Sequence, residues 1–83
     1  MIVEVVLPRE GRVRARMLQI AREAIEHVME EQGIKGTIMN FLPPKFEDDR
    51  IVIPALVYTR LPSGSWRIRI GQILAEVRAG GLG

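Results

Sequence analysis

Cysteine is absent from this sequence and histidine occurs once, and both facts remove classes of function. Without cysteine the chain has no disulfide, no thiol nucleophile, no iron–sulfur cluster and no Cys-ligated zinc. One histidine supplies too few ligands for most other zinc or copper sites. The range of enzyme chemistries open to the chain is therefore narrow.

The remaining polar candidates do not form a catalytic motif. His27 has no serine or cysteine nucleophile near it in the sequence, so we interpret it as a residue at the border of a helix's apolar side. The acidic run at residues 47–49 lacks the alternating spacing and the later glutamate of an EF-hand loop. We expect a non-enzymatic protein with no cofactor and no bound metal.

Long apolar runs and amides are also scarce. No stretch approaches the roughly 20 apolar residues of a membrane span, and Met1 leads directly into a strand-like segment instead of a basic and then hydrophobic leader. We expect a cytoplasmic protein without membrane contact.

Four amides, and arginine at ten of the twelve basic positions, are typical of a thermophile-like composition.

What is present fits one small folded domain spanning residues 1–83, because 47% of the residues are hydrophobic and 27% are charged. Residues Ile2–Leu7 are mostly β-branched and predict a strand that Pro8 ends. Apolar residues with the period of a helix predict a helix over 13–29, closed by Gly33; they lie at positions 13, 17, 20, 21, 24, 25 and 28.

The start of this helix is ambiguous, because no Ser, Thr, Asp or Asn precedes Thr37 to cap it. On a helical wheel Arg14 falls inside the apolar arc, so the first turn overhangs the sheet or the helix begins near Ala15. Alternatively, residues 8–11 form a turn and residues 12–17 form a hairpin strand. We favour the helix.

Further strands are predicted over 34–42, 51–59 and 66–70, with loops at 43–50 and 61–65. Pro54 cannot donate a ladder hydrogen bond, which predicts an edge strand or a bulge. We expect 51–59 and 66–70 to form a hairpin, with Trp66, Ile68 and Ile70 on one face. Residues 71–79 are compatible with a short C-terminal helix or with another strand.

The order β-α-β-β-β, with a possible short C-terminal helix, predicts an α+β two-layer sandwich in which one long helix packs on a small mixed sheet. One helix covers only one face of a sheet. Because a domain of this size has little stability to spare, burying the other face against a second copy is favourable, and we expect a homo-oligomer.

Charge is segregated along the chain. Arginines gather at the start of the predicted helix and around the predicted hairpin, whereas glutamates occupy the helix's second half. This arrangement opposes the helix dipole, so local stability does not explain it. The candidate nucleic-acid-binding residues are Arg12, Arg14, Arg16, Arg60, Arg67 and Arg69.

Two functions follow from these observations. The first is a basic module that binds a nucleic-acid backbone or another polyanion through its arginines. The alternative is an oligomerising or adaptor subunit that docks on another protein, its arginines paired with carboxylates of its own or a neighbouring chain. The two differ in whether the arginines share one face without acidic partners.

Overall fold

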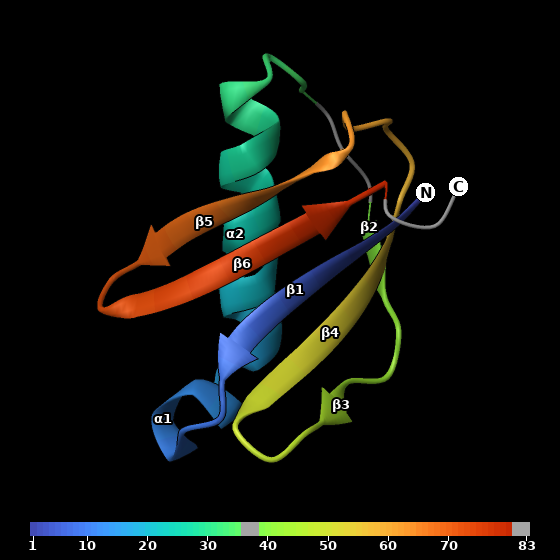
Figure 1. Cartoon of the computed structure of the whole chain (residues 1–83). Coiled ribbons are helices and arrows are strands. Elements are labelled where there is room, and N and C mark those ends of the chain that lie inside the picture. The colour runs from blue at the N-terminus through green and yellow to red at the C-terminus, as the bar shows by residue number, and fades with distance from the viewer. Residues whose placement is uncertain (36–38, 81–83) are drawn as a thin grey trace.

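The computed structural model describes residues 1–35 and 39–80, and its fold is a small α+β domain with one long helix on an antiparallel sheet (Figure 1). The elements in chain order are β1 (Ile2–Pro8), α1 (Gly11–Arg14), α2 (Met17–Glu31), β2 (Met39–Phe41), β3 (Lys45–Phe46), β4 (Arg50–Val57), β5 (Gly64–Ile70) and β6 (Ile73–Ala79). The predicted class is confirmed, and the described sheet has more strands than expected.

The strands lie in the order β2-β4-β1-β6-β5, and β3 also pairs with β4. Every described pairing is antiparallel, so the prediction of a mixed sheet was wrong. A parallel pair needs a crossover between neighbouring strands, but α2 connects β1 to β2, which do not pair. The first strand of the chain therefore lies in the middle of the sheet.

The predicted hairpin of residues 51–59 with 66–70 was also wrong. β4 and β5 are separated in the sheet by β1 and β6, and β5 pairs instead with β6 through the two-residue turn Gly71-Gln72. Gly71 has φ 62°, as the first turn position of a type II′ hairpin requires. Residues 73–79 are a strand and not a helix, and Leu74 is left 45% exposed.

The predicted helix exists but is broken at Ala15 and Arg16 into α1 and α2. A continuous helix would put Arg14 on the apolar arc, whereas the break buries Val13 and leaves Arg14 exposed. The solvation of the Arg14 charge is the physical reason for the interruption. Because α1 and the start of α2 are helical, the strand alternative for residues 12–17 is ruled out. Neither helix has a capping side chain at its N-terminus.

Gly33 ends α2 as predicted, in a Schellman motif. Its φ is 72°, its N–H donates to Glu30 O at 3.0 Å, and the N–H of Ile34 donates to Met29 O at 2.9 Å. After this turn the predicted strand over 34–42 is reduced to β2, and residues 36–38 lie outside the described part of the chain. The predicted loop at 43–50 contains the short strand β3.

Pro54 lies in an interior strand, so the first predicted alternative, an edge strand, was wrong. The second, a bulge, has a counterpart on the partner side: the three residues 42–44 lie opposite the two residues 53–54 of β4. β4 pairs with β1 on one side and with β2 and β3 on the other. Pro54 stands at the break between β2 and β3, where its carbonyl accepts a hydrogen bond from the N–H of Leu42 at 2.9 Å. No partner there needs the missing proline N–H, which is how the strand tolerates it.

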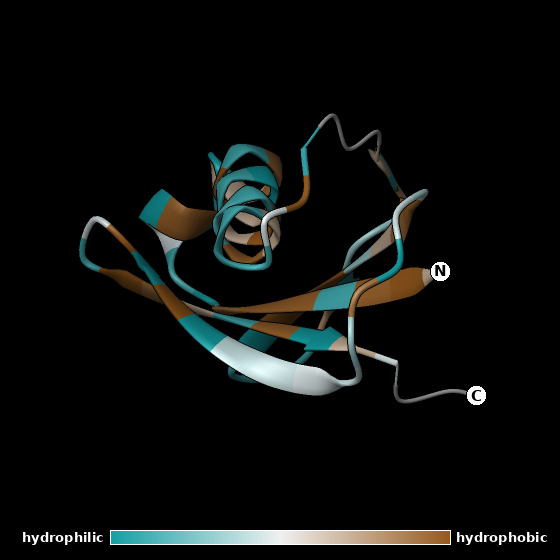
Figure 2. Ribbon diagram, turned by 90° about the horizontal axis from the view of Figure 1, so that it is seen from above, coloured by the Kyte–Doolittle hydropathy of each residue, from teal (hydrophilic) through white to brown (hydrophobic). Residues whose placement is uncertain are grey.

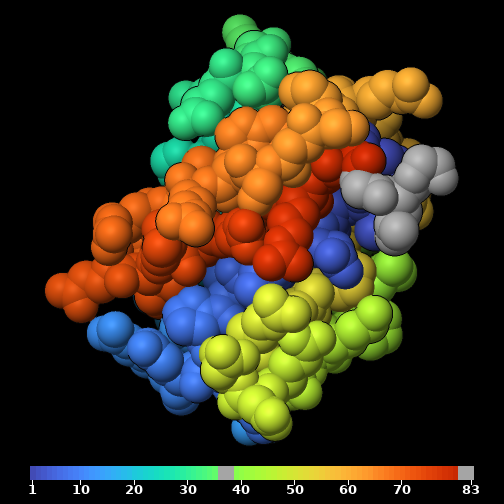
Figure 3. Space-filling model, in the orientation of Figure 1, coloured from blue at the N-terminus to red at the C-terminus, as the bar shows by residue number. Residues whose placement is uncertain are grey.

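The core lies between the helices and one face of the sheet (Figure 2). β1, β4 and β6 contribute alternate residues to it, and Trp66, Ile68 and Ile70 of β5 share this face, as predicted. No described element covers the other face, which is called the open face below and is turned to the viewer in Figures 1 and 3. Within the described residues no helix is long and apolar enough to cross a membrane.

Candidate anion-binding surface

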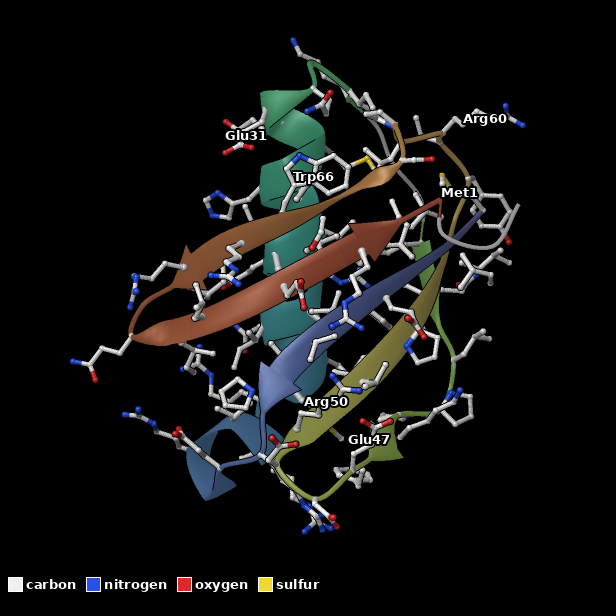
Figure 4. All side chains as sticks on the ribbon, in the orientation of Figure 1. Met1, Glu31, Glu47, Arg50, Arg60 and Trp66 are labelled. Carbon is white, nitrogen blue, oxygen red and sulfur yellow. The ribbon has the colours of Figure 1, made fainter. Side chains whose placement is uncertain are left out.

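The six predicted arginines do not converge on one site; they divide among four places in the fold. Arg12, Arg67 and Arg69 lie on or beside the β5–β6 hairpin, and Arg14 packs against β3. Arg60 is in the β4–β5 loop, near Met1 at the opposite end of the sheet from α1 (Figure 4). Arg16 is exposed at the start of α2.

Arg12 connects α1 to the turn of the β5–β6 hairpin. Its Nη1 donates to Gln72 Oε1 at 3.4 Å, and its Nε lies 3.3 Å from Glu10 Oε2. The side chains of Arg12 and Glu10 are 62% and 50% exposed, so the ion pair is solvated and adds little stability. The Arg12 guanidinium therefore stays accessible from solvent next to the turn.

Arg67 and Arg69 project onto the open face from β5, because they alternate with the buried Ile68. Opposite them in β6 lie Glu76 and Leu74. Neither arginine makes an ion pair or hydrogen bond within the described residues. Together Arg12, Arg67 and Arg69 are called the arginine strip below: it runs along β5 and around the end of the hairpin.

The backbone of β5 adds unpaired donors to this strip. β5 is the last strand in the sheet order, so one of its sides has no partner among the described residues. In an antiparallel hairpin with a two-residue turn, the residues flanking the turn exchange hydrogen bonds, and alternate residues point their N–H groups outward. These outward N–H groups belong to Ser65, Arg67 and Arg69, the same residues that face the open side.

Glu76 is the acidic centre of the open face and limits its positive charge. Its carboxylate accepts hydrogen bonds from Ser65 Oγ at 2.7 Å and from Arg78 Nε at 3.1 Å. The hydrogen bond from Ser65 contributes most to lowering the pKa of Glu76 below its ordinary value, followed by Arg78, with a smaller effect from the nearby charge of Arg67. Arg78 is thereby neutralised, and the surplus charge of this face lies on Arg67 and Arg69.

Arg14 has a structural role. Its guanidinium lies 5.0 Å from the centre of the Phe46 ring, and that of Arg9 lies 5.8 Å from the same ring. Nη1 of Arg9 also donates to Glu47 O at 2.6 Å. These contacts hold α1 against β3, so Arg14 is removed from the candidate site. No sequence pattern indicates this pairing, because residues 14 and 46 meet only through the tertiary fold.

Two contributors were missed by sequence reasoning. Gln72 joins Arg12 to the hairpin, and Glu76 organises the open face. Both lie in the segment whose secondary structure was ambiguous. A strand interpretation of residues 73–79 would have placed Glu76 opposite Arg67 by simple alternation.

The glutamates of α2 are not partners of these arginines. Glu23, Glu26, Glu30 and Glu31 make no ion pair within the described residues, and they lie on the helix side of the molecule. The helix side is thus acidic and the hairpin edge of the open face is basic. In the described ranges no three His, Asp or Glu side chains cluster as a metal site would require.

The candidate surface is a solvated arginine strip with outward backbone donors. Known protein families, curated proteins and solved structures offer no match to this chain.

Proposed function

We propose that the protein is a non-enzymatic module that binds the phosphate backbone of a nucleic acid along the arginine strip. The observation that carries the proposal is the pair Arg67 and Arg69, which stand exposed on an edge strand and form no ion pair within the described residues, although Glu76 lies opposite Arg67. Charge-assisted hydrogen bonds from arginine to phosphate oxygens are among the strongest that a protein surface makes.

The spacing of the strip favours a polymer over a small anion. Residues two apart on one face of a strand are separated by about 6.7 Å, so Arg67 and Arg69 offer two charges in a row with N–H groups beside them. Arg12 extends the row around the turn. A ligand with regularly repeated negative charges satisfies all of these groups at once, whereas a single phosphate ion satisfies only one.

The same geometry favours contact with the backbone and not with bases. Trp66, the aromatic residue of β5, packs against the core on the helix side and offers no stacking surface next to the arginines. Backbone contacts position a protein on nucleic acid without reading sequence. We therefore expect binding that is largely independent of sequence and strongly dependent on salt.

The test measures affinity for a fluorescent duplex and a single strand over a range of salt concentrations. The slope of log affinity against log salt reports about 0.9 per phosphate contact on duplex DNA and about 0.7 on single strands. The double variant Arg67→Ala/Arg69→Ala should reduce this slope by about two contacts. Arg60→Ala is the control, because Arg60 is an exposed arginine at the other end of the sheet and forms no ion pair within the described part of the chain.

Undetectable binding by the unaltered chain at low salt would reject the proposal. A loss of about one contact in Arg60→Ala, half that of the double variant, would show that the protein is attracted by overall charge and has no strip. Rejection would favour the second candidate, a subunit that docks on another protein. That candidate rests on a different observation, the large apolar side chains left exposed on the open face, such as Ile2 at 44% and Leu74 at 45%.

A further inference from the structure

The open face carries an apolar projection at the end of the sheet away from α1. Ile2, Leu56 and Asn40 lie side by side in register on β1, β4 and β2. Tyr58 follows β4 and is 63% exposed, the most exposed of the large apolar side chains described, and its hydroxyl accepts a hydrogen bond from Asn40 Nδ2 at 3.2 Å. The Tyr58 ring therefore stands over the β4–β2 side of β1. Ile2, Leu56 and Tyr58 together are called the projection below.

A groove of about 670 Å³ lies on the other side of β1. Ile2 and Glu4 form its wall on β1, and Arg78, Gly80 and Ser63 form the wall toward β6 and β5. The groove and the projection are thus on opposite sides of the middle strand of the sheet, and both border on Ile2.

Polar groups that line the groove include Glu4 and the Met1 ammonium, which donates to Val57 O at 2.7 Å. Glu4 makes no hydrogen bond or ion pair within the described residues, whereas Arg78 is already bonded to Glu76. A partly buried carboxylate prefers a hydrogen-bond donor. A tyrosine side chain has the complementary chemistry, because it joins an apolar ring to a hydroxyl that can donate.

We propose that a second copy of this chain docks on the open face, with Tyr58 of each copy in the groove of the other. When two copies face each other across a two-fold axis parallel to β1, the β4–β2 side of one copy lies over the β6–β5 side of the other. The projection of one copy then lies opposite the groove of its partner, and the Tyr58 hydroxyl can donate to Glu4. A surface that carries both complementary parts is what an isologous contact requires.

Charge also favours this occupant. The projection of Ile2, Leu56 and Tyr58 has no ionisable group of arginine or lysine type, so two copies meet there without like-charge repulsion. The strip residues Arg67 and Arg69 lie toward the α1 end of β5, outside this contact. The edge of β5 is a poorer contact between copies, because antiparallel pairing of two such edges sets arginine against arginine.

The area available makes the dimer weak. Five strands about 4.8 Å apart and about 23 Å long give the whole open face roughly 550 Å². The contact at the Tyr58 end uses only part of this face, so it buries well under the roughly 800 Å² per partner of a standard stable interface. We therefore expect association in the micromolar range that depends on protein concentration. This proposal does not rest on nucleic-acid binding, which uses the other end of the sheet.

Sedimentation equilibrium of the full chain over a wide concentration range tests the proposal. We expect a monomer–dimer equilibrium that Tyr58→Ala abolishes. Tyr58→Phe should weaken it by about a hundredfold or more, because both rings stay and the two symmetry-related hydrogen bonds to a charged acceptor are lost. Leu18→Ala is the matched control, since Leu18 is 45% exposed on α2 and should leave association unchanged.

The proposal is overturned if the unaltered chain sediments as a monomer up to millimolar concentration, a result that would leave the groove to another protein. It is also overturned if a dimer forms and Tyr58→Ala leaves it intact. Thermal unfolding followed by circular dichroism establishes that each variant is folded. We expect the Tyr58 variants to fold, because the Tyr58 side chain is exposed and not part of the core. Val57 is not a usable test position, because it is fully buried against the helix side.

Discussion

Gly80→Ala should destabilise the fold more than the same substitution at either of two other glycines with positive φ. Gly80 has φ 74°, Gly71 has φ 62° and Gly33 has φ 72°, so alanine is strained at each. They differ in their surroundings. A Cβ at Gly80 would lie 2.9 Å from Ser63 Cα and 3.0 Å from Ser63 Cβ, whereas nothing lies within 4 Å of a Cβ at Gly71 or Gly33.

The expected magnitudes follow from separating strain from overlap. A left-handed conformation costs an alanine about 1–2 kcal/mol, and this is the whole expected effect at Gly71 and Gly33. At Gly80 the overlap is with Ser63 Oγ, which can rotate away, and with Ser63 Cα and Cβ, which cannot move without the backbone. Overpacking of this kind adds roughly 1–3 kcal/mol. Gly80→Ala should therefore cost about 2–5 kcal/mol, a large part of the roughly 4–12 kcal/mol expected for a domain of this size.

Urea denaturation followed by circular dichroism measures the free energy of unfolding of the three variants. Gly71→Ala and Gly33→Ala serve as controls, because they introduce the strain without the overlap. If all three variants lose the same stability, the close approach of the β4–β5 loop to the end of β6 is not a feature of the folded protein in solution. If none loses stability, the positive φ values themselves are refuted.

Three further predictions can be tested by urea denaturation. Glu76 has a lowered pKa, so its ionised form stabilises the fold above its ordinary pKa of 4.5, and this stability is lost as the pH falls further. Glu76→Gln should therefore lower the free energy of unfolding by up to about 1 kcal/mol at pH 7 and by nothing near pH 2. A loss of stability that is independent of pH would contradict this. Ile53→Ala, at a fully buried position, should cost about 2–5 kcal/mol, and a loss below that range would mean that Ile53 is not in the core. Phe46→Ala should cost about 1–2 kcal/mol through its lost contacts with Arg9 and Arg14, and a neutral result would show that the ring does not hold α1.

The sequence was most informative where periodicity was long. The apolar period of α2, its glycine terminator and the alternation of β5 all predicted elements that the structure contains. These features depend on neighbours within one element, so a single sequence shows them. The break between α1 and α2 was visible only as a conflict, the position of Arg14 on the apolar arc.

Pairing partners were beyond the sequence. The hairpin was expected between the segments flanking 61–65, but the chain there crosses to the far edge of the sheet and the hairpin forms at Gly71. Short apolar segments do not specify which strand lies beside them, since every such segment can bury the same face. The candidate site depended on this choice, and so only Arg12, Arg67 and Arg69 of the six predicted residues remain together.

The middle position of β1 has a consequence for how the chain folds. β1 is synthesised before both of its neighbours, β4 and β6, and Val3 pairs with Ala79 near the other end of the described chain. Contacts so far apart in sequence close late and slow the folding reaction. During synthesis this apolar strand stays unpaired until β4 and β6 have left the ribosome. A truncation before β6 would leave β1 with an unpaired edge, which favours aggregation.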